Sequence, residues 1–282
     1  MGNKHLWTEK KIEHRIKNGY GSGFKENYIP WLKVQDVPSN GIVKRVRGKI
    51  VPRVYHFMSL LEFQYFTLLE WSDKVRDIRE QFPLFHREDA QYIADLKGIK
   101  YPVYPQTKVP IMMTSDFAIQ ANDGLGNAFE VIRTVKPSKE LHNKRVLEKL
   151  EIERVYWKKR KIDWGIVTEK DICPNKIFNL NFFRGAHFIN RELPINDLIL
   201  YLYDHLSKCD SQNIQSLLVN LDKKTNQSLG TFLTVFKFSL SHKLIEIDMS
   251  KKINLRELCC KEILIMKGDP ILYVLQENGL RA

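Results

Sequence analysis

Three polar side chains stand in otherwise apolar segments in the middle of the chain. Asp116 interrupts the run Thr114-Ser-Asp-Phe-Ala-Ile119, Lys136 ends a second apolar run, and Glu62 follows Ser59 at the start of a third. Carboxylates are ligands that Mg²⁺ prefers, and a lysine beside them can orient water or stabilise charge on phosphorus. Such a set is what metal-assisted hydrolysis of a phosphodiester requires.

Each of these residues also has a purely structural interpretation. Ser59 and Glu62 have the spacing of a capping box, in which the glutamate satisfies a helix terminus. Asp116 could be an acid at a strand edge, and Lys136 could extend its ammonium group to solvent from a strand end. An acid and a lysine separated as Asp116 and Lys136 are occur by chance in most long basic chains. Their spacing alone therefore does not decide between the catalytic and the structural interpretation.

The elements around these residues predict that they converge. A tight turn over 122–127 makes its two flanking strands neighbours, which brings Asp116 and Lys136 to one end of a sheet with Glu62 on a nearby helix. The expected helices cover residues 59–71, 87–96 and 138–160, and the expected strands cover 75–82, 112–120, 128–136 and 162–167. This succession predicts an α/β domain with a mixed sheet flanked by helices.

The pattern becomes helical beyond residue 170. Apolar residues recur at helical spacing over 193–206, 211–221 and 229–244, and short β-like pieces follow at 245–249 and 262–266. Three helices with a small hairpin resemble a winged helix, although they also describe many helical bundles. We therefore expect two domains, residues 1–170 and a mostly helical, winged-helix-like domain over 171–282 for contact with a partner or with DNA.

The charge of the chain is concentrated near its beginning. The 282 residues include 45 Lys and Arg against 33 Asp and Glu, and residues 1–53 hold 12 basic and 4 acidic side chains. A hairpin expected over 42–57 carries several of these cations. A basic N-terminal arm on near-neutral domains indicates contact with a polyanion, although a solvated tail is the alternative. The candidate DNA-binding residues are Lys44, Arg45, Arg47, Lys49 and Arg53.

Several other classes of protein do not fit this sequence. No apolar run approaches the roughly 18 residues of a membrane span, and the first residues lack the apolar core of a secretory signal. The four cysteines form no Cys-x-x-Cys motif, which argues against a zinc ribbon or a disulfide framework. We expect a cytoplasmic protein with reduced thiols and no membrane contact.

Short stretches of the chain, in order, resemble the TnsA endonucleases, the nuclease subunits of heteromeric cut-and-paste transposases. This family belongs to the PD-(D/E)xK superfamily, whose order of acid, strand, turn, strand and lysine the chain also follows. The matching stretches span about residues 10–165 and are 27–32, 34–38, 70–71, 77–84, 114–117, 135–137, 147–151 and 156–157. The resemblance implies a restriction-endonuclease-like sheet in the first domain.

The resemblance also implies roles for individual residues. Glu62 and Asp116 fall on the family's metal ligands, with Asp116 the principal one, and Lys136 falls on its catalytic lysine. Thr134 stands where the superfamily has an acid and this family usually a glutamine, so only its backbone carbonyl is expected to coordinate metal. Glu153 matches an acid of the family that could bind metal through water, or it could be a solvated helix glutamate.

The function implied by the resemblance is that of a Mg²⁺-dependent DNA endonuclease, with Mn²⁺ able to substitute. It would nick double-stranded DNA at the 5′ ends of a transposon, together with a DDE-type transposase and an AAA+ ATPase regulator. It would act in the bacterial cytoplasm, associated with the nucleoid. Two alternatives remain: another nuclease of the superfamily, for restriction or repair, or a catalytically degenerate DNA-binding adaptor, which Thr134 slightly favours.

Overall fold

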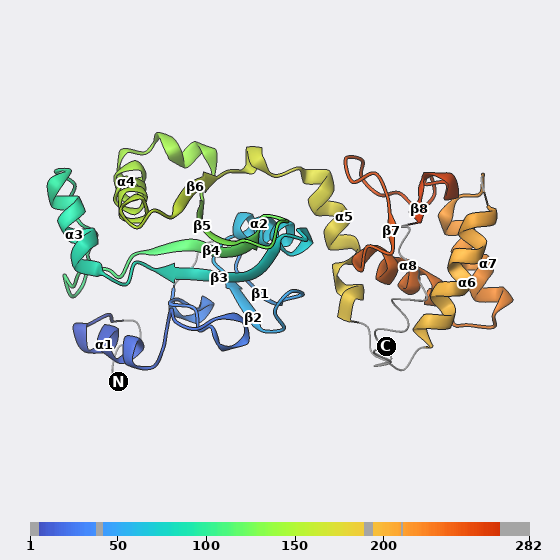
Figure 1. The fold of residues 1–282 in the computed structure, drawn as a ribbon, viewed down its shortest axis with the longest axis horizontal. Helices are drawn as coiled ribbons and strands as arrows, with labels where there is room; N and C mark the ends of the chain where they lie inside the picture. Colours follow the sequence, from blue (N-terminus) through green and yellow to red (C-terminus); the bar gives the residue numbers. More distant parts are fainter. Residues whose placement is uncertain (1–5, 38–41, 189–193, 210, 266–282) are drawn as a thin grey trace. The chain divides into compact units, whose positions relative to one another are not determined.

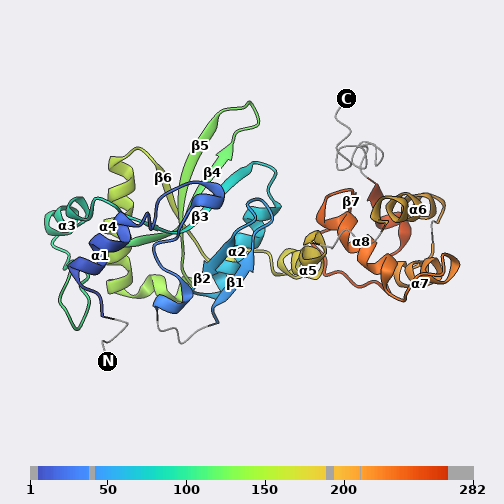
Figure 2. The ribbon, with the colours of Figure 1, turned by 90° about the horizontal axis from the view of Figure 1, so that it is seen from below.

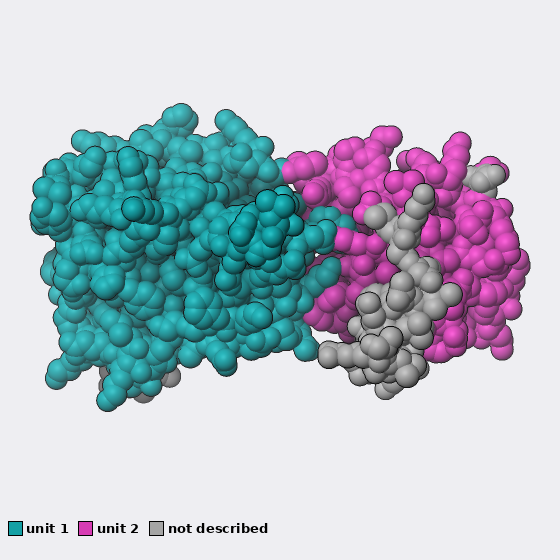
Figure 3. Space-filling model, in the orientation of Figure 1, with its two compact units in different colours: residues 1–172 teal, residues 173–282 magenta. Residues whose placement is uncertain are grey.

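The computed structural model describes residues 6–37, 42–188, 194–209 and 211–265. The chain forms two compact units, residues 1–172 and 173–282, shown in separate colours in Figure 3. This division lies two residues from the boundary expected near residue 170. In the ranges that the structure describes, no helix is both long and apolar enough to cross a membrane.

The first unit is built on a mixed four-stranded sheet, as the sequence predicts. Its strands lie in chain order, with β3, β4 and β5 antiparallel and β6 parallel to β5 (Figure 1). The strands are β3 (Val75–Pro83), β4 (Thr114–Asn122), β5 (Ala128–Val135) and β6 (Asp163–Val167). The parallel pair requires a crossover, which the long helix between β5 and β6 provides.

A five-residue turn sets the register between β4 and β5. The Asp123 carboxylate accepts the backbone N–H groups of Leu125 and Asn127, at 2.7 and 3.1 Å. Gly124 and Gly126 have φ of +90° and +94°, a left-handed conformation that glycine adopts without steric cost. The resulting register brings the first residues of β4 beside the last residues of β5.

Helices cover the two faces of the sheet, as Figure 2 shows. On one face, α3 (Arg87–Leu96) and α4 (Lys144–Lys159) pack on the sheet through a cluster of buried residues that includes Ile93, Ala118, Ile132 and Trp157. On the other, Phe117 packs against Phe57 of a hairpin, which itself contacts Phe66 of α2 (Leu60–Trp71). The sheet is therefore the middle layer of this unit.

The single helix predicted over 138–160 is divided in the structure. A 3-10 helix, η3 (Ser138–His142), comes first, and Asn143 then begins α4. The Asn143 side chain accepts the backbone N–H groups of Arg145 and Val146, at 2.8 and 3.3 Å. This N-cap satisfies donors that a helix terminus leaves unpaired, so it favours a new helix start at this position.

The N-terminal segment, which its charge indicated as a basic arm, forms a packed layer of the first unit. It contains α1 (Glu9–Lys17) and two 3-10 helices, η1 (Lys25–Asn27) and η2 (Val34–Asp36). Trp7, Ile12 and Trp31 form a buried cluster with Met112. Arg15, one of the basic residues counted there, is buried and forms an ion pair with the half-buried Asp36 at 2.7 Å. The hairpin expected over 42–57 is present as β1 (Lys44–Arg47) and β2 (Val54–Phe57).

The second unit is mostly helical. Three of its helices match the predicted ones, and β7 and β8 form a two-residue antiparallel pair. Helix α5 was not predicted, and the expected helix start at residue 193 and strand end at residue 266 lie outside the described residues. The elements are α5 (Pro174–Arg184), η5 (Gly185–Phe188), α6 (Ile195–Lys208), α7 (Ile214–Lys224), α8 (Thr231–Ser241), β7 (Ile245–Glu246), η6 (Cys260–Glu262) and β8 (Leu264–Ile265).

Candidate active site

Glu62 lies in the first turn of α2 and is 5 % exposed. Ser59 is the N-cap: its hydroxyl accepts the Glu62 N–H at 3.1 Å and donates to Glu62 Oε1 at 2.9 Å. Met58 N–H donates to Glu62 Oε2 at 3.0 Å. Glu62 therefore does take part in capping α2, as its structural interpretation predicts. The same carboxylate also lies close enough to Asp116 and Lys136 for their charges to shift its pKa.

Asp116 and Lys136 are in direct contact. Lys136 Nζ lies 3.2 Å from Asp116 Oδ2, and the same carboxylate oxygen accepts the Val135 N–H at 2.7 Å. The Lys136 backbone N–H donates to Val167 O of β6 at 3.0 Å. Since β4, β5 and β6 all contribute to these contacts, the end of the sheet fixes the acid and the lysine together, as the sequence predicts.

The three charged groups shift one another's ionisation. Burial and then the Asp116 carboxylate raise the pKa of Glu62 from its usual 4.5 to about 7, although its hydrogen bonds and Lys136 oppose this. Burial alone would lower the pKa of Lys136, but Asp116, Glu62 and Glu153 raise it to about 12. Two buried carboxylates thus face one lysine that stays protonated at neutral pH.

Glu153 is buried below this cluster at 4 % exposure, so its interpretation as a solvated helix glutamate is wrong. Its Oε1 accepts hydrogen bonds from the Ser115 hydroxyl at 2.6 Å, the Trp164 indole N–H at 2.9 Å and the Thr134 hydroxyl. Burial raises the pKa of Glu153 in spite of these donors. The Thr134 side chain is therefore bound to Glu153, which leaves its backbone carbonyl as the group that could face a metal.

The donor set fits a hard divalent cation. Within the described ranges, no three His, Cys, Asp or Glu side chains are grouped so that they could hold an ion by themselves. Mg²⁺, however, is commonly bound by one or two carboxylates and keeps several waters. Glu62 and Asp116 supply two carboxylates against the single ammonium of Lys136, and a divalent cation would compensate the repulsion that raises the pKa of Glu62.

Gln81 also contacts this site, although it was not among the predicted site residues. Its side-chain amide N–H donates to Glu62 Oε2 at 3.3 Å, and its amide oxygen lies 3.4 Å from the Thr114 hydroxyl. The polar pair Glu80-Gln81 inside a buried strand was the one available hint, since buried polar side chains need partners. Ser115 and Trp164, the partners of Glu153, were likewise not predicted.

Four of the five basic residues proposed for DNA binding lie on or beside the β1–β2 hairpin surface. Arg45 and Arg47 are exposed, whereas Lys44 and Lys49 are half-buried, with their ammonium groups over the rings of Phe63 and Trp71. Strand β2 ends one residue before Met58, whose N–H binds Glu62. The hairpin therefore leads directly into the carboxylate cluster.

Arg53, the fifth residue predicted to bind DNA, is not on this surface. Its guanidinium is bound inside the protein, with Nη2 at 2.5 Å from Glu80 Oε2 and 2.8 Å from Ile78 O. The two side chains are 8 % and 0 % exposed. This buried ion pair joins the hairpin to β3, so Arg53 cannot reach a phosphate without leaving an unpaired carboxylate inside.

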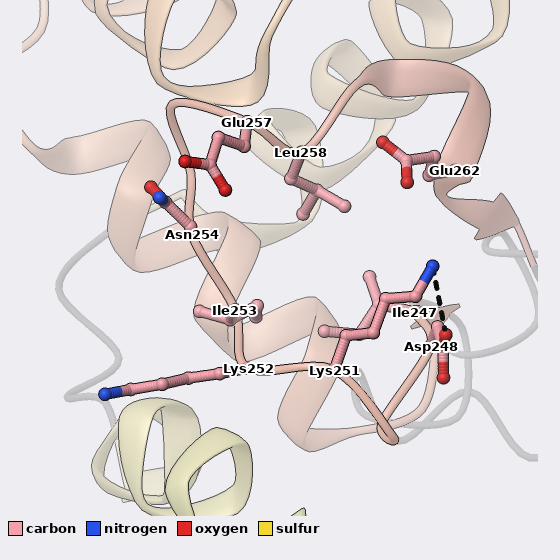
Figure 4. A pocket seen from close by; sticks show the side chains of 9 residues that line it. All are labelled: Ile247, Asp248, Lys251, Lys252, Ile253, Asn254, Glu257, Leu258 and Glu262. Carbon is pink, nitrogen blue, oxygen red and sulfur yellow. Dashed lines mark ion pairs between the residues drawn. The ribbon is translucent and has the colours of Figure 1, made fainter. Parts of the chain in front are cut away.

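The second unit contains a cavity of about 140 Å³, whose lining differs from the cluster of Glu62, Asp116 and Lys136 (Figure 4). Its ion pair, between Lys251 and Asp248 at 3.8 Å, is exposed to solvent, and Glu262 accepts the Cys259 N–H at 2.8 Å. It does not combine buried carboxylates with a half-buried lysine, as the cluster of Glu62, Asp116 and Lys136 does. The lining residues are Ile247, Asp248, Lys251, Lys252, Ile253, Asn254, Glu257, Leu258 and Glu262.

The mixed sheet with its helical crossover and flanking helices has the fold of the restriction-endonuclease-like class. Residues 72–169 match the model for the TnsA-like endonuclease N terminal, and residues 171–249 match that for the TnsA endonuclease C terminal. The chain is 33 % identical over 264 residues to the Transposon Tn7 transposition protein TnsA of Escherichia coli, covering 93 % of this chain and 95 % of that protein. The chain therefore belongs to the TnsA endonuclease family.

Proposed function

We propose that this chain is the Mg²⁺-dependent DNA endonuclease subunit of a heteromeric transposase and that it nicks DNA at the 5′ ends of the transposon. The observation that carries this proposal is the cluster of Glu62 and Asp116 around Lys136. Membership in the TnsA endonuclease family supports transposition over restriction or repair.

Each residue of the cluster has a distinct task in this proposal. Glu62 and Asp116 would hold Mg²⁺, or Mn²⁺ in its place, with the carbonyl of Thr134 as a further ligand. The bound ion supplies neutralisation of the scissile phosphate and activation of a water. Asp116, Glu62 and Glu153 outweigh burial and raise the pKa of Lys136 to about 12 in the metal-free protein, so its ammonium group can orient water or stabilise charge on phosphorus.

Binding of the substrate is assigned to the hairpin. Lys44, Arg45, Arg47 and Lys49 would contact phosphates of double-stranded DNA at the transposon ends, next to the strand that leads into Glu62. A DDE-type transposase and an AAA+ ATPase regulator are the proposed protein partners, with the second unit as their docking surface. The proposed location is the bacterial cytoplasm, at the nucleoid when the protein is active.

Thr134 slightly favoured the degenerate-adaptor alternative. Its hydroxyl is bound to Glu153, and Glu62, Asp116 and Lys136 are all retained around it. With threonine at this position, Lys136 still contacts Asp116, and the charges of both still act on Glu62. We therefore favour the enzyme over the adaptor.

Strand nicking by the assembled complex, in Mg²⁺ and with all partners present, tests the proposal. Asp116→Ala should abolish the cut made by this subunit, because the metal loses its principal carboxylate, while the partner's cut persists. Lys136→Ala should slow it by roughly 10²–10³-fold, the effect of removing one preorganised charge-stabilising donor.

Asp95→Ala, which removes an exposed carboxylate from α3, is the matched control and should cut at the wild-type rate. DNA binding and folding should be retained in every variant. Normal nicking by Asp116→Ala would refute the active site.

A further inference from the structure

Gln81 has a backbone conformation that is unusual for its position. Among the described residues, six non-glycine residues have positive φ, and Gln81, at φ +50°, is the one that lies inside a strand. An L-residue in this left-handed region is strained by contact between its Cβ and the backbone. Strain of this kind persists only where the surroundings enforce it, and it is concentrated at functional sites.

The left-handed residue changes which way the side chains of β3 point. Glu80 contacts the hairpin through Arg53 and the His56 N–H, and Phe82 packs against Trp157 of α4. Regular alternation would put residues 80 and 82 on the same face of the sheet. The turn at Gln81 separates them, and it directs Gln81 toward α2, where its amide meets Glu62.

The register places Gln81 at the centre of the proposed site. Glu80 pairs with Phe117 and Phe82 with Ser115, so Gln81 stands opposite Asp116. Its side chain is 4 % exposed and uses both ends of the amide, with the N–H on Glu62 Oε2 and the oxygen beside the Thr114 hydroxyl. One buried residue therefore joins the strand of Asp116 to the carboxylate of Glu62.

Hydrogen bonds from the N-terminal layer stabilise the left-handed backbone conformation of Gln81. The Gln81 carbonyl accepts the backbone N–H of Trp31 at 3.3 Å, and the preceding carbonyl, that of Glu80, accepts the Tyr28 hydroxyl at 2.9 Å. Trp31 and Tyr28 are both buried, and Trp31 O in turn accepts the Arg15 guanidinium. The peptide groups on both sides of Gln81 are thus fixed by side chains and backbone outside the sheet.

We propose that Gln81 is a positioning residue that holds the Glu62 carboxylate in place to bind metal jointly with Asp116, and that the strained backbone exists to aim its amide. This inference rests on the function proposed above. Groups that hold a metal ligand in this way typically change metal affinity or activity by about 10–100-fold when they are removed.

The first experiment measures Mg²⁺ binding to the full-length protein by isothermal titration calorimetry and nicking by the complex as a function of Mg²⁺ concentration. Gln81→Met keeps the length of the side chain and removes the amide, and we expect binding about 10–100-fold weaker. Nicking should recover to near the wild-type rate at saturating Mg²⁺. Gln120→Met, at a half-buried glutamine on the neighbouring strand β4, is the matched control and should bind Mg²⁺ normally.

A second pair of variants separates strain from hydrogen bonding. Gln81→Gly and Gln81→Ala both remove the amide, so both should weaken Mg²⁺ binding equally. Only glycine tolerates the positive φ without strain, so its melting temperature should exceed that of the alanine variant by about 2–4 °C. A glycine variant that is no more stable than the alanine variant would overturn the strained-backbone part of the inference.

The outcomes distinguish this inference from the proposed function. If the wild type binds Mg²⁺ and nicks while Asp116→Ala does neither, but Gln81→Met matches the wild type in Mg²⁺ affinity, the inference fails and the function stands. A loss of stability in Gln81→Met without a change in Mg²⁺ affinity also overturns it, because the residue would then be merely structural. A wild type that binds no Mg²⁺, or an active Asp116→Ala variant, overturns both.

Discussion

Glu62 has two tasks with opposite electrostatic consequences. As part of the cap of α2, its ionised carboxylate is stabilised by the Ser59 hydroxyl and the Met58 N–H. As a member of the site, it is buried beside Asp116, and the balance raises its pKa to about 7. A protein without bound metal therefore holds a carboxylate that costs stability whenever it is ionised, and a bound cation would remove that cost.

This balance predicts a pH dependence of stability. The pKa of Glu62 rises from 4.5 to about 7 on folding, so the folded protein binds more protons in that interval and loses stability as pH rises through it. Glu62→Gln removes the loss and should stabilise the metal-free protein by about 1–3 kcal/mol at pH 8, with little effect at pH 5. Urea denaturation in a chelator measures this difference.

The same stability measurement in the presence of Mg²⁺ provides the control for that prediction. Added Mg²⁺ should stabilise the wild type at pH 8 and leave Glu62→Gln nearly unchanged, because the variant has lost one of the two carboxylates. An equal difference between the two proteins at pH 5 and pH 8 would show that the pKa of Glu62 is not raised by folding.

Single residues differ in how far the sequence predicts them. Glu62, Asp116 and Lys136 could be found because a charged residue in an apolar segment is conspicuous and the turn over 122–127 fixes which strands pair. Gln81 could not, because its contact with Glu62 depends on one positive φ that breaks the alternation of β3. The burial of Glu153 likewise depends on how α4 lies on the sheet.

At the scale of elements, the β1–β2 hairpin separates two kinds of basic residue. Arg45 and Arg47 point outward from β1, in the alternating pattern of a strand with one solvated face. Arg53, just before β2, turns inward to Glu80. Arg53 therefore differs in role from Arg45 and Arg47, although all three are arginines of the same hairpin. The difference arises because Arg53 has a buried acidic partner, whereas Arg45 and Arg47 face solvent.

Replacement of Lys44, Arg45 and Arg47 by alanine should flatten the salt dependence of DNA binding. Each phosphate contact contributes about −0.9 to the slope of log affinity against log salt for duplex DNA, through release of counterions. The folded stability should change little, since Arg45 and Arg47 are exposed and Lys44 loses only its contact with the Phe63 ring. Fluorescence anisotropy with a labelled transposon end at several salt concentrations measures the slope; an unchanged slope would place the DNA surface elsewhere.

Arg53→Met is the contrasting variant for that experiment. It leaves Glu80 buried without its partner, so it should destabilise the protein by about 3–5 kcal/mol. Its slope against salt, measured where the variant is still folded, should equal that of the wild type. A flattened slope with normal stability would return Arg53 to the DNA-binding residues.

Elements with strong periodicity or sharp end signals could be predicted, and the others could not. Helix α2 begins at its Ser59 cap and the β4–β5 turn contains two glycines, so both match the expected positions closely. Helix α5 could not be predicted because asparagines and two phenylalanines that are not buried separate its buried residues Ile177, Leu180 and Phe183 and weaken the pattern. The packing of the N-terminal layer could not be predicted, because composition does not reveal that Arg15 pairs with Asp36.

At the scale of the whole molecule, each unit has a core of its own. In the second unit, α6, α7 and α8 bury residues such as Leu202, Leu221 and Phe236. Helix α5 is tied to the segment before η6 by Asn179, whose amide N–H donates to Lys251 O at 2.7 Å and whose amide oxygen accepts the Ile253 N–H at 2.8 Å. Asn179 is fully buried, so these bonds are shielded from water.

We therefore expect residues 171–282 to fold as a soluble, helical fragment that competes with the full-length protein for its partners in the transposition complex. A shorter fragment that begins at residue 185 lacks α5, and with it the buried side chains of Ile177, Leu180 and Phe183 and both Asn179 hydrogen bonds. It should be markedly less stable, because several buried apolar side chains at roughly 1.5–3 kcal/mol each are lost.

Circular dichroism during thermal unfolding compares the two fragments, and residues 1–172 serve as the reciprocal fragment, which should fold alone and still bind Mg²⁺. If neither 171–282 nor 1–172 gives a cooperative transition, the two units are one folding domain; if the fragment from 185 is as stable as the fragment from 171, α5 is a linker and the boundary of the second unit lies beyond it.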